Sequence, residues 1–142
     1  MKDFLLKYLK SNPDAFIWVC AWVTYCHAVD DVIDGDKTDS KFILDTFRFA
    51  PVLFGNVFYL TNLSALYPLV LMSHDAYEES VRMEKSNQKW QRHYADILRQ
   101  SANEVILKGI EIVGGLELRQ KASLELRELS YKTHHDETGK PV

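Results

Sequence analysis

Three aspartates and a histidine lie close together at the end of a long apolar segment, Phe16–Ile33. Its second half contains His27, Asp30 and Asp31, and Asp34 follows directly. If the segment is helical, a rotation of about 100° per residue places these four side chains within one arc of roughly 100°. Grouped carboxylates at the carboxyl end of a helix are unfavourable, because the helix dipole and their mutual repulsion oppose them. A hard divalent cation would offset this cost, since Mg²⁺ prefers carboxylate oxygens and often bridges to phosphate.

A solvated helix end is the alternative interpretation of the same residues, because the aspartates lead into a turn of sequence DGDKTD. The apolar residues before them lie on every side of the expected helix, which is typical of a helix surrounded by others. That pattern favours a metal site over an ordinary exposed helix end.

The stretch from Trp22 to Gly35, WVTYCHAVDDVIDG, resembles the first aspartate-rich motif of squalene and phytoene synthases, which are class I isoprenoid (terpenoid) synthases. The resemblance implies that Asp30, Asp31 and Asp34 hold Mg²⁺, with Mn²⁺ as the alternative ion, and through it a substrate diphosphate. His27 stands where those enzymes usually carry arginine, so the resemblance gives it a position near the substrate. The matching stretch covers 14 of the 142 residues.

A second polar cluster runs from Ser73 to Glu84 with the sequence SHDAYEESVRME. On a helix four of its residues share an arc of about 100°: Asp75, Glu78, Glu79 and Arg82. We expect Asp75, Glu78 and Glu79 to be the opposing carboxylates of the metal site. We expect the basic and imidazole side chains that follow to contact the diphosphate: Arg82, Lys89 and His93. A solvent-facing helix surface with its own ion pairs explains the segment equally well.

Three alternatives to a prenyl-diphosphate site remain open. His74 and Asp75 resemble the metal dyad of HD-domain phosphohydrolases, which need an earlier histidine and a later aspartate; His27 and either Asp96 or Asp136 are the candidates. Acidic clusters on two helices also resemble the all-α nucleotide pyrophosphohydrolases, in which Mg²⁺ lies between them. The third alternative is a non-catalytic helical protein that binds a partner.

The elements that must position these residues are all expected to be helices. Asn12-Pro13 is a helix start, Gly35 and Gly114-Gly115 are stops, and Pro51 is expected to end the helix before it. No alternating strand pattern occurs, so we predict an all-α bundle of five to seven helices in one domain over residues 1–133, with a loose tail over 134–142. The expected helices are 1–10, 13–34, 40–50, 51–62, 64–84, 87–113 and 116–131.

Composition limits the possible partners and the cellular location. Seventeen basic and twenty acidic residues give a net charge of -3, which argues against a nucleic-acid partner. Cys20 and Cys26 lie six apart on one expected helix and cannot pair, which favours a reducing cytoplasm. Residues 15–29 carry no formal charge, but they fall short of the roughly 20 residues of a membrane span. We therefore expect a core helix and no membrane span.

Length bears on the chemistry that the resemblance implies. The catalytic bundle of the isoprenoid synthases is about twice as long as this chain, so we expect a minimal version of that bundle. A second copy, forming a homodimer, could supply the missing walls of a substrate cavity. The residues expected to line such a cavity are aromatic: Trp18, Trp22, Phe47, Phe54, Phe58 and Tyr59.

Overall fold

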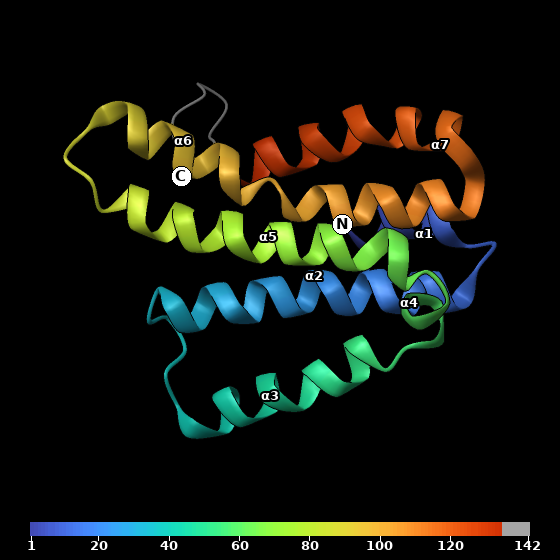
Figure 1. Cartoon of the computed structure of the whole chain (residues 1–142), viewed down its shortest axis with the longest axis horizontal. Coiled ribbons are helices and arrows are strands. Elements are labelled where there is room, and N and C mark those ends of the chain that lie inside the picture. Colours follow the sequence, from blue (N-terminus) through green and yellow to red (C-terminus); the bar gives the residue numbers. More distant parts are fainter. Residues whose placement is uncertain (135–142) are drawn as a thin grey trace. The chain divides into compact units, whose positions relative to one another are not determined.

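The computed structural model describes residues 1–134, and every regular element in that range is a helix (Figure 1). This confirms the predicted all-α fold, and the count of seven lies within the predicted five to seven. The predicted tail lies, except for His134, outside the described residues. The helices are α1 (Lys2–Leu9), α2 (Pro13–Ile33), α3 (Ser40–Phe54), α4 (Val57–Thr61), α5 (Leu63–Glu84), α6 (Lys89–Arg99) and α7 (Ala102–His134).

The helices fall into two compact units, which are described separately below. The N-terminal unit, Lys2–Leu63, holds α1 to α4, and the C-terminal unit begins at Ser64 and holds α5 to α7. The single domain expected over residues 1–133 stays a prediction.

The N-terminal unit is built around the first half of α2. As predicted, Asn12 caps this helix: the Ala15 N–H donates to Asn12 Oδ1 over 3.0 Å, and Pro13 occupies the first turn. Trp18 is fully buried, and its indole Nε1 donates to the Leu53 carbonyl of α3 over 3.0 Å. Its ring also stacks on Tyr59 of α4, with 5.3 Å between centroids. Trp18 therefore connects three helices of the unit.

The second half of α2 is less covered than the sequence predicted. The fully buried residues of α2 all lie between Ala15 and Trp22, and no residue of α2 beyond Trp22 is fully buried. The reason is geometric: α1 has 8 residues, about 12 Å at 1.5 Å per residue, and can cover only the start of α2. Among the described helices, α2 alone is long and apolar enough to cross a membrane by length and composition, a test that core helices also pass.

Pro51 does not end α3, and the prediction of a helix end at Ala50 is wrong. The helix continues to Phe54, where the Gly55 N–H donates to the Pro51 carbonyl over 2.8 Å. Proline lacks an N–H and its ring crowds the carbonyl four residues earlier, but the turn that follows it can still form its own backbone bonds. A new cap then starts α4: the Phe58 N–H donates to Asn56 Oδ1 over 2.8 Å. The predicted helical character of residues 51–62 is confirmed, divided at Gly55-Asn56.

In the C-terminal unit, the single helix predicted over residues 87–113 is interrupted, which corrects that prediction. Between α6 and α7 the Gln100 N–H donates to Ile97 and the Asn103 N–H to Gln100, over 3.1 and 3.0 Å. Each bond joins residue i to residue i−3 and not to residue i−4 as in an α-helix, so the chain is wound more tightly there. The amphipathic pattern of the sequence continues through this break, so the sequence alone does not reveal the break.

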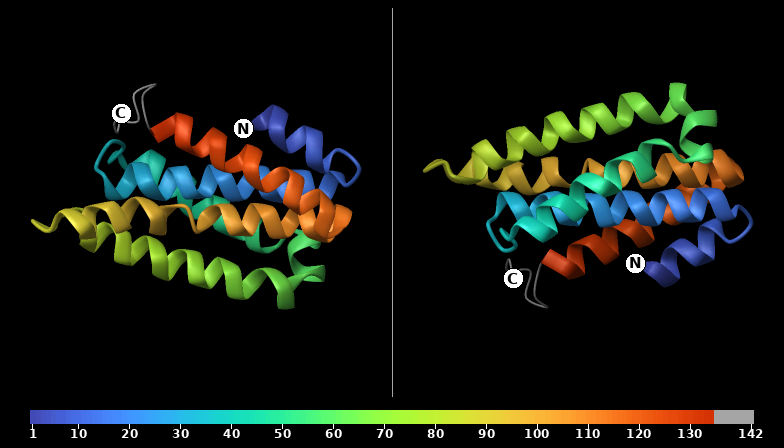
Figure 2. Two further views of the ribbon diagram at one scale, coloured as in Figure 1. Left: turned by 90° about the horizontal axis from the view of Figure 1, so that it is seen from above. Right: turned by 90° about the horizontal axis from the view of Figure 1, so that it is seen from below.

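Gly115 divides α7 into two limbs that run side by side, as Figure 2 shows. Its backbone has φ 81° and ψ 179°, a conformation open essentially to glycine alone. Polar contacts join the limbs: Asn103 Nδ2 donates to Ser130 Oγ over 3.0 Å, and Glu104 pairs with Arg119 at 3.1 Å and Arg127 at 2.6 Å. The predicted break at Gly114-Gly115 is confirmed.

We expect Trp18→Ala to lower the free energy of unfolding by about 3–5 kcal/mol, because it empties a fully buried site and leaves the Leu53 carbonyl without its donor. Urea unfolding followed by circular dichroism measures the effect. Ile17→Ala is the matched control, since Ile17 is exposed on the same helix, and it should change stability by less than about 0.5 kcal/mol. Equal effects of the two substitutions would contradict the assigned core.

We expect Gly115→Ala to cost about 1–3 kcal/mol, because alanine does not adopt the Gly115 backbone conformation without strain. The same unfolding experiment measures it, with the exposed Glu117→Ala two residues away as control. A Gly115→Ala protein as stable as the parent would show that α7 does not need this turn.

Candidate functional site

The acidic segment begins where α2 ends. The Asp34 N–H donates to the Asp30 carbonyl over 2.9 Å, and the next residue, Gly35, has φ +81° and closes the helix. A glycine in this left-handed conformation is a common helix stop, which explains why the sequence turns here. The Lys37 N–H then donates back to the Asp31 carbonyl over 3.1 Å. The chain after the aspartates is therefore folded back onto the helix end.

Negative charge is concentrated in this segment. Residues 30–39 contain five aspartates and one lysine, a net charge of -4. The lysine is used locally, because Lys37 Nζ lies 2.6 Å from Asp31 Oδ2. Asp39 is also used, since it caps α3 by accepting the Phe42 N–H over 2.9 Å. The carboxyl end of the α2 dipole adds to the negative potential, so this end of the helix attracts cations.

The predicted metal ligands lie on the last turns of α2 as expected from their spacing. Asp30 and Asp31 are partly buried, whereas His27 and Asp34 are exposed. Across residues 1–134, however, no three histidine, cysteine, aspartate or glutamate side chains lie close enough together to hold a metal ion. The structure thus places the ligands on one helix end without assembling them into a metal cluster.

The second predicted constellation belongs to the C-terminal unit. Asp75 and Glu78 are exposed on α5, and Glu79 is hydrogen-bonded to Arg82 one turn later. Lys89 and His93 are exposed on α6. Their convergence with the aspartates of α2 stays a prediction. The Glu79–Arg82 pair itself is what a solvent-facing helix surface would form. Asp136, proposed for the HD alternative, lies outside the described residues.

The aromatic residues predicted to line a cavity are in contact with one another in the N-terminal unit. Trp18 lies 5.9 Å from Phe58 and 5.3 Å from Tyr59 between ring centroids, and Phe54 lies 5.6 Å from Tyr59. Phe47 is different: it is 71% exposed, so it is not part of this aromatic group. Its position on the outer side of α3 was not visible in the sequence, where every phenylalanine of the segment could face inward.

The residues of α2 that precede the aspartates lie in surroundings of low polarity. Burial raises the pKa of the Cys26 thiol from its usual 9.0 to about 12, and the negative charge of Asp30 adds to the rise. Burial likewise raises the pKa of Tyr25 and, with a smaller opposing effect of Lys2, that of Cys20. Both cysteines are free thiols, as expected. A raised thiol pKa is the opposite of what an activated cysteine nucleophile needs.

A groove of about 440 Å³ in the C-terminal unit was missed by the sequence reasoning. Its charged residues pair with each other: Lys108 Nζ lies 2.7 Å from Glu111 Oε1, and Arg119 Nε lies 3.3 Å from Glu111 Oε2. The spacing of Lys108 and Glu111 is visible in the sequence, but Arg119 reaches them only because α7 folds back at Gly115. The lining residues are Ala65, Pro68, Leu69, Glu104, Lys108, Glu111 and Arg119.

Comparisons of the chain with known protein families, with curated proteins and with solved structures find no match. The candidate site is therefore argued from its own residues.

We expect the Cys26 thiol to react slowly with a disulfide reagent in the native protein. At about pH 8 a rise in pKa from 9.0 to about 12 lowers the thiolate fraction roughly a thousandfold. A Cys20→Ser variant isolates Cys26, and the same protein unfolded in urea is the reference. Equal reaction rates in the native and unfolded proteins would contradict the assigned burial.

The same difference in pKa makes the stability of the protein depend on pH. Because the pKa of Cys26 is higher in the folded protein, this thiol stabilises the fold below about pH 9, and that contribution is lost as the pH rises toward 12.

Proposed function

We propose that the acidic carboxyl end of α2 binds Mg²⁺, with Mn²⁺ as a substitute, and through the cation the diphosphate group of a small molecule. The observation that carries this proposal is the charge of residues 30–39, five aspartates and one lysine at the negative end of a helix dipole. Such an arrangement costs free energy unless a cation compensates it. The resemblance of WVTYCHAVDDVIDG to the squalene and phytoene synthase motif points to an isoprenoid diphosphate as the small molecule.

The site as proposed needs a local rearrangement, because no three ligand side chains converge in the part of the chain that the structure describes. Lys37 must leave Asp31 before that carboxylate can accept a cation. This release is inexpensive: the lysine side chain is 53% exposed, and ion pairs at surfaces contribute only about 0–1 kcal/mol. A divalent ion competing for the same oxygens replaces one positive charge by two.

A hydrocarbon chain attached to the diphosphate also needs apolar surface, and the N-terminal unit provides some. On α2 the partly covered Val23 lies one turn before His27, on the same side of the helix as Asp30 and Asp34. Burial of such surface stabilises a complex by about 25 cal/mol per Å². An isoprenoid therefore fits this helix end better than a nucleotide, for which the sequence offers no glycine-rich phosphate loop.

We expect isothermal titration calorimetry to detect binding of a prenyl diphosphate only when Mg²⁺ is present. Asp30→Asn or Asp34→Asn should weaken this binding at least about tenfold, since even outer-shell substitutions at metal sites cost about 10–100-fold. Asp45→Asn is the matched control, because Asp45 pairs with Lys41 on α3 and carries the same charge. It should bind as the parent does.

Absence of Mg²⁺-dependent heat, or equal losses in Asp30→Asn and Asp45→Asn, would overturn the proposed function. Phosphate release from nucleotides in a parallel assay would instead favour the phosphohydrolase and pyrophosphohydrolase alternatives.

A non-catalytic helical protein is the second candidate, and one observation favours it. Leu44 and Phe47 are exposed on α3, and with Pro51 they follow the i, i+3, i+7 spacing of one apolar helix stripe. Exposed apolar stripes of this kind are typical of surfaces that meet another molecule. This candidate would remain if both the diphosphate and the nucleotide assays are silent.

A further inference from the structure

Helix α6 exposes the apolar side that an amphipathic helix normally buries. Trp90, Tyr94 and Ile97 follow the i, i+4, i+7 spacing of one stripe, and they are 57%, 54% and 57% exposed. Trp90 and Tyr94 contact each other edge to face, with 6.2 Å between ring centroids. The one fully buried residue of this helix is Ala95, which lies on a different side. The stripe of Trp90, Tyr94 and Ile97 is called the α6 stripe below.

The inward side of α6 is held by a polar anchor, which explains the unusual orientation. Arg99 is hydrogen-bonded to Glu84 at the end of α5, and its guanidinium lies 5.7 Å from the ring centroid of Tyr77. An arginine that is fixed by a carboxylate and an aromatic ring in this way sets the rotation of the helix that carries it. With Arg99 turned inward, the α6 stripe on the other side is turned outward.

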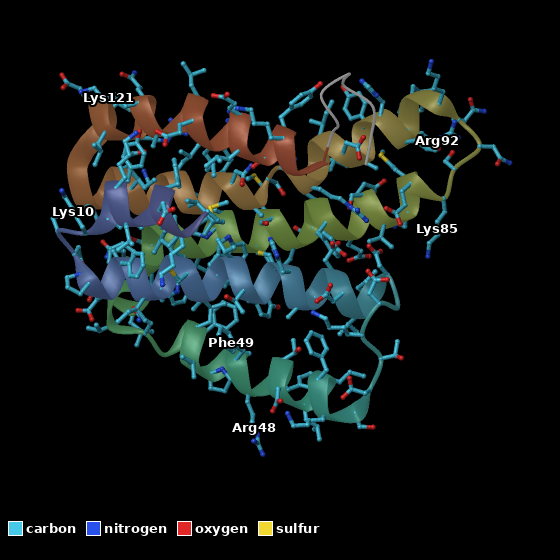
Figure 3. The ribbon with its side chains drawn as sticks, turned by 180° about the vertical axis from the view of Figure 1, so that it is seen from behind. Lys10, Arg48, Phe49, Lys85, Arg92 and Lys121 are labelled. Atoms are coloured by element: carbon cyan, nitrogen blue, oxygen red, sulfur yellow. The ribbon has the colours of Figure 1, made fainter. Side chains whose placement is uncertain are left out.

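Basic residues gather around the start of α6. From Lys85 to Asp96 the chain contains three basic residues and one acid, a net charge of +2, and Arg99 beyond them is paired with Glu84. Figure 3 shows Lys85 and Arg92 at the end of the hairpin between α5 and α6. Arg92 Nη1 donates to the Ser86 carbonyl over 2.8 Å, a contact that leaves its charge uncompensated. The hairpin end therefore combines exposed aromatic surface with an excess of positive charge.

We propose that the α6 stripe docks on an anionic lipid bilayer surface, with the helix lying in the plane of the headgroups. A strongly amphipathic helix of low overall hydrophobicity, with tryptophan on one side and lysine and arginine around it, is the type that binds at this boundary. Tryptophan and tyrosine prefer the headgroup level, because their rings are apolar and their N–H and O–H groups stay hydrated. Lys85 and Lys89, at the start of the helix, face lipid phosphates by charge complementarity.

The area of the α6 stripe favours a lipid surface over a second copy of the chain. Aromatic side chains offer about 150–250 Å² each, so three half-exposed side chains present roughly 350 Å². A stable protein interface buries about 800 Å² on each partner, and two such stripes facing each other would stay below the roughly 1,000 Å² expected of a biological contact. A bilayer needs no matching groove, and its charge adds to the apolar contact.

The experiment measures sedimentation of the full chain with lipid vesicles. The protein should bind vesicles of phosphatidylcholine containing phosphatidylserine, bind pure phosphatidylcholine weakly, and bind less as the salt concentration rises. Lys85→Gln with Lys89→Gln should weaken binding about 25-fold, at about fivefold for each charge near the surface. Lys10→Gln with Lys121→Gln is the control of equal charge, at exposed positions elsewhere in the chain, and it should leave binding within about twofold of the parent.

A second pair of substitutions tests the apolar contact. Trp90→Ala with Tyr94→Ala should abolish binding, whereas Leu124→Ala, at a 79% exposed apolar position on α7, should not change it. Fluorescence quenching by brominated lipid reads Trp90 in the unsubstituted protein, since Trp18 and Trp22 are buried. Equal binding to both vesicle types, no binding, or no quenching would overturn the proposal. A dimer that Trp90→Ala dissociates would also overturn it, in favour of a second copy. The vesicle assay contains no Mg²⁺ or diphosphate, so its failure is separate from failure of the proposed function.

Discussion

The buried bond from the Trp18 indole to the Leu53 carbonyl is the contact on which the N-terminal unit depends. It fixes the carboxyl end of α3 against the first half of α2, and Tyr59 stacks on the same indole. Because α3 must return along α2 to reach this contact, the segment between the two helices is held as a short turn at the far end of α2. That turn contains most of the aspartates. Asp30 and Asp31 lie on α2 itself, so the bond at the opposite end of the helix positions only the turn that follows them.

The surroundings of α2 become more polar from its start to its end, and the candidate site lies at the polar end. The first half of α2 belongs to the buried aromatic core. In the middle of the helix, burial raises the pKa of Cys26 to about 12. The end of the helix is charged and partly exposed. Charges at such a boundary interact more strongly than charges in open water, because less solvent screens them. A cation placed there would gain more from the aspartates than it would from the same residues on a fully exposed helix.

Local chemistry in the sequence predicted most helix ends, and tertiary contacts determined the rest. Asn12-Pro13, Gly35 and Gly114-Gly115 act through their own backbones, so their effect is visible without a fold. The continuation of α3 through Pro51 and the break before Ala102 depend on the helices around them. The same division holds for the site: spacing placed Asp30, Asp31 and Asp34 on one helix end, but spacing cannot say whether their side chains converge. The outward rotation of α6 could not be predicted from the sequence either. It follows from the contacts of Arg99 with Glu84 and Tyr77, which lie on another helix.

The net charge of -3 hides two segments of opposite local charge. Residues 30–39 carry -4, whereas residues 85–96 carry +2. A whole-chain average therefore says little about any one surface, because screening in physiological salt limits each charge to about 8 Å. Binding at either segment depends on its own charges and on the apolar residues beside them. On α2 the apolar residues precede the aspartates along the helix and are partly covered, which suits a small ligand with a hydrocarbon chain. On α6 the apolar residues face outward, which suits an extended surface.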